Sequence, residues 1–202
     1  MSGFLSVLTA LGLSGSAGLN AYLPLLIVAL LARYTHLIQL REPWAALTSG
    51  WTIAVLVVLL VIETLADKVP AINHINDVIQ TLIRPTAGAI LFAASSNVIS
   101  ELHPVLAIIC GILVAGTIHA IKSAVIRPTV TGVTAAPTGG LATIPANIVV
   151  SIMEDIVAVV ASLVAILVPL ILALVMLAAV ITIAGWLLNQ QRVRNQAKTK
   201  QA

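Results

Sequence analysis

The chain has 202 residues, of which 60% are hydrophobic and 8% are charged, and its formal net charge is +3. Its mean hydropathy is +1.12. Soluble domains have about 25% charged residues, so this composition predicts a membrane protein with several spanning helices and excludes a soluble catalytic domain. The basic residues are scattered or terminal, so we expect no nucleic acid partner. The one cysteine, Cys110, excludes an internal disulfide.

The first apolar segment, residues 4–32, is long enough to cross a bilayer, which takes about 20 apolar residues. Its middle, residues 13–24, reads LSGSAGLNAYLP and contains Asn20, Tyr22 and Pro24. Glycine loosens the backbone and proline removes an amide donor, so this stretch predicts a broken helix. Two interpretations are open. The break holds a substrate or an ion, as discontinuous helices do in transporters, or the small residues form a seam against a second helix.

The rest of the chain predicts five further spans. The expected elements are a polar link at 33–48, a second span at 51–66, an amphipathic interfacial helix at 69–83, a short third span at 87–99, a fourth span at 105–126, a Gly/Pro-rich cytoplasmic loop at 127–147, and two spans within 148–188. The last run is about twice the length of one span, so we divide it near Pro169, with a single long kinked helix as the alternative. The predicted fold is an all-α transmembrane bundle of about six spans.

Residues 1–188 are expected to form a single membrane domain, followed by a basic polar tail at 189–202. With six spans and a cytoplasmic tail, all basic residues except Arg33 and Arg41 lie inside, which fits the positive-inside bias. We therefore expect a bacterial inner (plasma) membrane protein with both termini in the cytoplasm. The tetrapeptide IRPT at 83–86 recurs at 126–129, which fits either an inverted repeat of residues 1–100 and 101–188 or a chance match.

Charged residues within or beside the expected spans mark the candidate site, because such charges usually face a partner or a wet cavity. Glu63 and Asp67 are four residues apart and share one helix face. Glu154 and Asp155 lie near the start of the fifth span. The basic residues expected at the same membrane level are Lys68, Arg84, Lys122 and Arg127. These groups either pair at the cytoplasmic surface or line a polar vestibule, in which Glu63 or Glu154 carries a proton or a cation.

Catalytic motifs are absent from the sequence, which has no Gly-x-Ser-x-Gly elbow, no Walker loop and no His-Glu-x-x-His. We expect no cofactor. The sequence has no recognised metal-ligand spacing, and it does not decide whether a metal ion binds. Gly139 and Gly140 end a PTGG stretch. Such a stretch cradles a phosphate when it precedes a helix, or simply turns the chain.

Four short motifs follow one another along the chain. They are SAGLNAYLP at 16–24, ExxADKxP at 63–70, RPxxG at 84–88, and a GG loop at 139–140 that leads to ED at 154–155. In this order the sequence resembles a family of small bacterial integral membrane proteins, the domain of unknown function 4126. The resemblance covers nearly the whole chain. It implies a multi-span inner-membrane protein and carries no established activity.

The leading expectation is a small transporter or channel for an ion or small solute. The predicted pathway residues are Asn20, Tyr22, Glu63, Asp67, Arg84, Arg127, Gly139, Gly140, Glu154 and Asp155. Two alternatives are open, an intramembrane enzyme that acts on a lipid or lipid phosphate and a non-catalytic partner in a membrane assembly. The expected partners are the lipid bilayer, the transported ion or solute, and a second copy of the chain bound through the small-residue seam.

Overall fold

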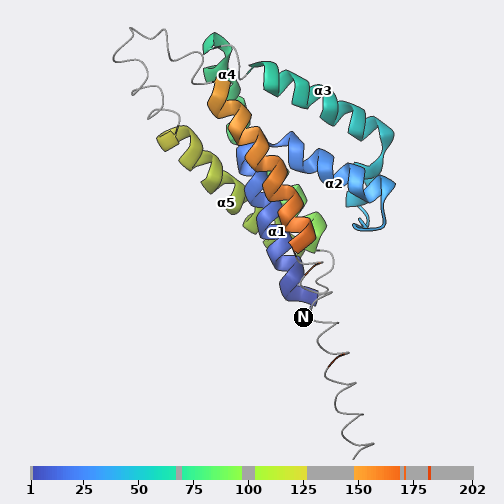
Figure 1. The fold of residues 1–202 in the computed structure, drawn as a ribbon. Coiled ribbons are helices and arrows are strands. Elements are labelled where there is room, and N and C mark those ends of the chain that lie inside the picture. The colour runs from blue at the N-terminus through green and yellow to red at the C-terminus, as the bar shows by residue number, and fades with distance from the viewer. Residues whose placement is uncertain are drawn as a thin grey trace, which may run out of the picture. The chain divides into compact units, whose positions relative to one another are not determined.

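The computed structural model describes residues 2–66, 70–96, 103–126 and 148–168, together with Ile171 and Thr182. The chain divides into two compact units, residues 1–166 and 167–202, and the contacts discussed below lie in the first. Every regular element in the described ranges is a helix (Figure 1). The elements are α1 (Ser2–Leu19), α2 (Tyr22–Tyr34), the 3-10 helix η1 (Trp44–Thr48), α3 (Gly50–Ala66), α4 (Pro70–Ser96), α5 (Pro104–Ile121), the π-helical turn η2 (Lys122–Ile126) and a helix at residues 148–168.

Three described stretches are long and apolar enough to cross a membrane: Val78–Ser95, Pro104–Ala124 and Ile148–Val168. The other apolar helices, in α1, α2 and α3, are shorter. Large apolar side chains point outward, among them Trp51 on α3 and Leu113 on α5. Such a surface suits lipid, which favours apolar contacts and cannot satisfy polar groups. The prediction of an all-α membrane bundle is confirmed.

The first apolar segment breaks as predicted, but it does not continue straight across. α1 ends at Leu19 and α2 begins at Tyr22, and the axis of the chain turns at this point (Figure 1). A pocket of about 170 Å³ is lined by Ser6 and Thr9 of α1, by residues 37–39 after α2, and by the end of α4. The end of α2 therefore returns toward the start of α1. Residues 4–32 therefore form two helices that meet at an angle, and the predicted break in this segment is confirmed.

α4 replaces two predicted elements, the interfacial helix at 69–83 and the short span at 87–99. It is one continuous helix of 27 residues. Its polar side chains Gln80 and Arg84 are each 1% exposed, whereas Val78 and Leu82 on the opposite side are 72% and 76% exposed. The prediction of a surface helix is therefore wrong. In a bilayer the apolar stripe of an amphipathic helix faces lipid and its polar stripe faces the protein interior.

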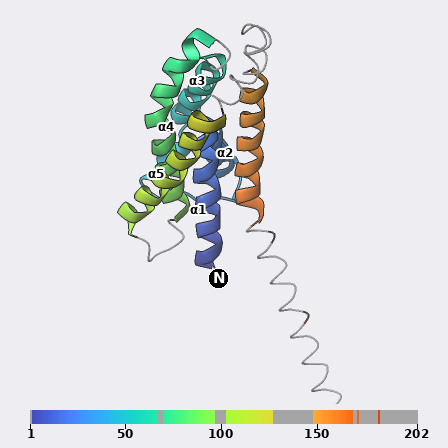
Figure 2. The same cartoon turned by 90° about the vertical axis from the view of Figure 1, so that its left-hand side faces the viewer.

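α1 is the central helix of the first unit. It packs against α4 and α5 on one side and against the 148–168 helix on the other (Figure 2). A side-chain carbon at Gly18 would lie 2.6 Å from the carbonyl oxygen of Ala115, so only glycine fits there. One at Gly111 would lie 2.6 Å from the Cα of Ala89, so α4 and α5 also touch through their backbones. The small residues of α1 do form a close-packed seam.

The predicted spans at 51–66 and 105–126 are both helical, in α3 and in α5 with η2, but of these two only the second is long enough to cross a membrane. The fifth span begins within the described helix at 148–168. The loop at 127–147, the junction near Pro169, the sixth span and the tail at 189–202 lie outside the described residues. The inverted repeat stays a prediction.

Candidate functional site

The start of α2 is held by Asn20, which lies in the break between α1 and α2. Its Oδ1 accepts hydrogen bonds from the backbone amides of Tyr22 and Leu23, each at 3.0 Å. The first amides of a helix have no partner within that helix, so Asn20 caps α2. Its Nδ2 donates to Oδ1 of Asp155 at 2.9 Å. One side chain therefore caps α2 and ties the break to the 148–168 helix.

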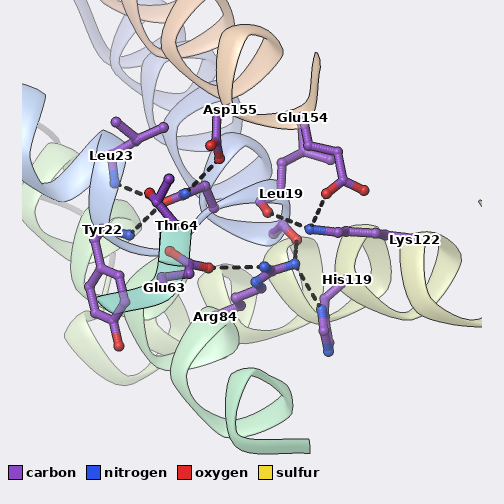
Figure 3. A network of polar contacts seen from close by, with 12 residues as sticks. Leu19, Tyr22, Leu23, Glu63, Thr64, Arg84, His119, Lys122, Glu154 and Asp155 are labelled. Carbon is purple, nitrogen blue, oxygen red and sulfur yellow. Dashed lines mark hydrogen bonds and ion pairs between the residues drawn. The ribbon is translucent and has the colours of Figure 1, made fainter. Parts of the chain in front are cut away.

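Arg84 of α4 lies at the centre of the polar network (Figure 3). Its Nη2 pairs with Oε1 of Glu63 on α3 at 3.0 Å, and both side chains are 1% exposed. Its Nη1 donates to the Gly18 carbonyl at 3.4 Å and to Nδ1 of His119 at 3.3 Å. Arginine can only donate, so Nδ1 of His119 is the unprotonated nitrogen and Nε2 donates to Thr81 at 3.1 Å. Arg84 thus joins α1, α3 and α5.

Lys122 forms a second buried ion pair. Its Nζ lies 2.6 Å from Oε2 of Glu154, and it donates to the Leu19 carbonyl at 3.0 Å. The C-terminal end of a helix carries partial negative charge on carbonyls that lack partners. Arg84 and Lys122 each satisfy one such carbonyl at the end of α1 and each bind one carboxylate. The broken helix and the two ion pairs therefore form one structure.

The break lies beside apolar helices long enough to cross a membrane. Arg84 is six residues after Val78, where the apolar stretch of α4 begins, so it lies about 9 Å along that stretch at about 1.5 Å per residue. α2 has 13 residues and spans about 20 Å, which is short of the roughly 30 Å hydrocarbon core. Backbone groups at this depth need partners from the protein, because lipid offers none.

Six of the predicted pathway residues are in the described part of the chain, and all six lie in or beside this network. They are Asn20, Tyr22, Glu63, Arg84, Glu154 and Asp155. Tyr22 is buried in the first turn of α2. The remaining four predicted residues, Asp67, Arg127, Gly139 and Gly140, lie outside the described residues, and the structure says nothing of their positions.

The ten predicted pathway residues left out Lys122, His119 and Gln80, although Lys122 was among the basic residues expected at the same membrane level as the carboxylates. The sequence contained patterns that could have indicated these residues. Gln80 and Arg84 are four residues apart and share a face of α4. His119 and Lys122 are three residues apart near the end of the otherwise apolar α5, and they are 4% and 1% exposed. A polar pair on one face of an apolar span predicts buried partners.

An apolar pocket of about 310 Å³ opens beside the break. Its lining residues are Leu23, Leu60, Thr64, Asp155, Ile156, Val159 and Val160. Only Thr64 and Asp155 among them have polar side chains. In the described ranges, no three or more His, Cys, Asp and Glu side chains gather closely enough to hold a metal ion.

The fold and the site together define a helical membrane protein with a charged network buried at a helix break. The chain belongs to the family described as Domain of unknown function (DUF4126), which matches residues 7–190. The family membership predicted from the four motifs is confirmed, and it assigns no activity. No curated protein and no solved structure matches the chain.

Proposed function

We propose that the protein is a small transporter or channel of a bacterial inner membrane. It moves an ion or a small solute along a path that includes the α1–α2 break, Glu63 and Glu154. One observation carries this proposal. Arg84 and Lys122 each bind a carboxylate and a carbonyl at the end of the broken helix, so charge and backbone shape are coupled. Transporters use helix ends at membrane depth in this way.

The energetics favour a functional role for the two ion pairs. Buried ion pairs contribute little net stability, because desolvation of the charges offsets their attraction. Apolar side chains of similar volume would hold the helices together at least as well. Charges inside a membrane are costly and commonly mark ion or proton pathways. A purely structural network would not need four ionised groups at the end of one helix.

The network supplies a mechanism for coupling. When Glu154 takes up a proton or a cation, its attraction for Lys122 weakens, and with it the hold of Lys122 on the Leu19 carbonyl. Protonation of Glu63 acts in the same way on Arg84 and the Gly18 carbonyl. The end of α1 then loses its partners and the break changes shape. A change of charge at Glu63 or Glu154 thus shifts the α1–α2 break from one conformation toward another.

The positive-inside bias supports an orientation with the Lys122 end of the bundle toward the cytoplasm. Arg33 lies in the last turn of α2 at the opposite end, and its Nη1 donates to the Thr48 carbonyl. The start of α1 shares that opposite end through the pocket lined by Ser6 and Thr9. We therefore place the N-terminal end of α1 outside, in place of the cytoplasmic N-terminus predicted from sequence.

The test is ion flux into proteoliposomes under an imposed proton or cation gradient. The variants are Glu63→Gln and Glu154→Gln, which remove charge at nearly constant volume. Glu42→Gln is the matched control, because Glu42 is exposed between α2 and α3. We expect flux in the wild type and in Glu42→Gln, and its loss in either network variant that still folds. Flux unchanged in all three variants would refute the carboxylate path.

A further inference from the structure

The side of α1 that faces the 148–168 helix carries a line of polar side chains. Ser6, Thr9, Leu13, Ser16 and Asn20 follow one another at spacings of three and four residues, so they share one face of the helix. Leu13 is the one apolar member of this line. Ser6, Thr9 and Leu13 line the pocket of about 170 Å³ at the far end of the bundle. Asn20 lies in the charged network at the other end.

Ser16 and Ser162 meet in the middle of this line. Their hydroxyl oxygens lie 2.8 Å apart, and the side chains are 2% and 0% exposed. Ser16 Oγ also contacts the Leu13 carbonyl at 2.8 Å, and Ser162 Oγ contacts the Ala158 carbonyl at 2.7 Å. Each hydroxyl has one proton, so two protons serve three contacts. One of the three contacts therefore always lacks a proton. When a hydroxyl rotates, a different contact becomes the one without a proton.

We propose that this seam between α1 and the 148–168 helix is a proton route, and that its hydroxyl pair relays the proton. This inference rests on the proposed function and names its cargo. A proton from water in the pocket reaches one serine oxygen, that serine releases its own proton to the other, and the second serine passes its proton toward Asp155 and Glu154. Rotation of both hydroxyls restores the pair, so no bond is changed overall.

Leu13 is the gate of this route. It is 1% exposed, lines the pocket, and lies three residues before Ser16. The pocket beyond it has polar side chains from four positions, Ser6, Thr9, Gln39 and Ser95. An apolar side chain between two polar regions excludes water and blocks conduction until water enters. Ser162 lies seven residues after Asp155, about 10 Å along the helix, so the proposed route requires water in that second gap.

The experiment measures proton entry with a pH-sensitive dye inside proteoliposomes, driven by a potassium diffusion potential. Ser16→Ala and Ser162→Ala are compared with Ser14→Ala. Ser14 is an equally buried serine of the same helix, but its hydroxyl donates to the Gly111 carbonyl on α5. We expect Ser16→Ala and Ser162→Ala to lower proton flux at least tenfold. Ser14→Ala should conduct like the wild type, and Ser16→Thr, which keeps the hydroxyl, should restore conduction.

The gate has its own pair of variants. Leu13→Ala should raise proton flux several-fold, whereas Leu91→Ala, at an equally buried leucine of α4 in the same core cluster, should not. A second measurement is independent of flux. In a Cys110→Ser background, a small cationic thiol reagent should label Thr9→Cys in the pocket and should label Ser16→Cys only when Leu13→Ala is also present.

The outcomes separate this inference from the proposed function. If Glu154→Gln abolishes proton flux while Ser16→Ala and Ser162→Ala conduct like Ser14→Ala, the route lies elsewhere and the transport proposal stands. If the wild type moves another ion or solute but no protons, the relay is refuted and transport again stands. If the wild type moves nothing under any gradient, both are refuted.

Discussion

The two sides of α1 differ in how they meet their neighbours. Toward α5 the backbones touch, with no room for a side-chain carbon at Gly18, and Gly12 packs as closely against the side chain of Ala165 in the 148–168 helix. Toward the 148–168 helix, polar side chains meet in pairs, Ser16 with Ser162 and Asn20 with Asp155. The first side positions the helix, and the second carries groups able to exchange protons. One small-residue stretch therefore serves close packing and polar contact at once.

This comparison explains why the sequence left two interpretations open for residues 13–24. A packing seam and a break that holds a substrate or an ion were weighed as alternatives. The seam is present and the helix breaks between Leu19 and Tyr22, whereas a binding role of the break stays a proposal. Glycines and serines suit both, because they permit close approach and supply small hydroxyl groups. The predictions below separate the two sides.

The largest effect is expected for Arg84→Met, which leaves the Glu63 carboxylate buried beside an apolar side chain. Removal of one partner of a buried ion pair costs about 3–5 kcal/mol. The double variant Glu63→Leu/Arg84→Met removes both charges, and we expect its unfolding free energy to return to within about 1 kcal/mol of the wild type. Titration with denaturing detergent measures both. A single variant as stable as the wild type would show that the pair is not held as the structure has it.

A smaller effect is expected for Gly111→Ala, at the contact between α5 and α4. The added carbon would lie 2.6 Å from Cα and 2.8 Å from the backbone nitrogen of Ala89, so α4 and α5 must separate. Overpacking of this kind costs about 1–3 kcal/mol. Gly15→Ala is the matched control, since its added carbon meets only Val114 at 3.9 Å. In a helix interior that change stabilises by about 0.5–1 kcal/mol. Opposite shifts in thermal midpoint are the expected result, and equal shifts would contradict it.

The smallest effect is expected for Asn20→Ala, which removes the cap of α2. Loss of an N-cap costs about 0.5–2 kcal/mol. Asn20→Ser keeps an oxygen that can accept from the α2 amides but lacks the donor to Asp155. We expect Asn20→Ser to recover most of the stability lost in Asn20→Ala, as measured by the same detergent titration. No recovery would mean that the contact with Asp155, and not the cap, accounts for the loss.

The helices themselves were predictable where hydrophobic length was the signal. α3 and α5 follow their predicted bounds closely because each is an apolar run with polar ends. α4 was not predictable in the same way. The spacing of Val78 and Leu82 against Gln80 and Arg84 gives the period of the helix. It does not say whether the apolar side faces protein or lipid. In a soluble protein the apolar side faces the interior, whereas in a membrane it can face lipid.

The members of the charged network were partly predictable, because ionised groups are few in this chain and each one inside a span is informative. Their pairing was not. Glu63 and Arg84 are separated by 21 positions and lie on different helices. The partner of Glu154 is Lys122 of the turn after α5, which depends on how α5 meets the 148–168 helix. The reversal at Asn20 was also hidden, since a break in an apolar run gives no direction for the chain that follows.

The most direct test of the central claim replaces the second ion pair by apolar side chains in Lys122→Met/Glu154→Leu. Because both charges are removed together, we expect this double variant to fold and to reconstitute in amounts equal to the wild type. Proton and cation flux into proteoliposomes is then compared between the two. The account predicts flux at the level of protein-free vesicles in the folded double variant. Flux equal to that of the wild type would show that the pair only holds the helices together, and would contradict a transport path through the α1–α2 break.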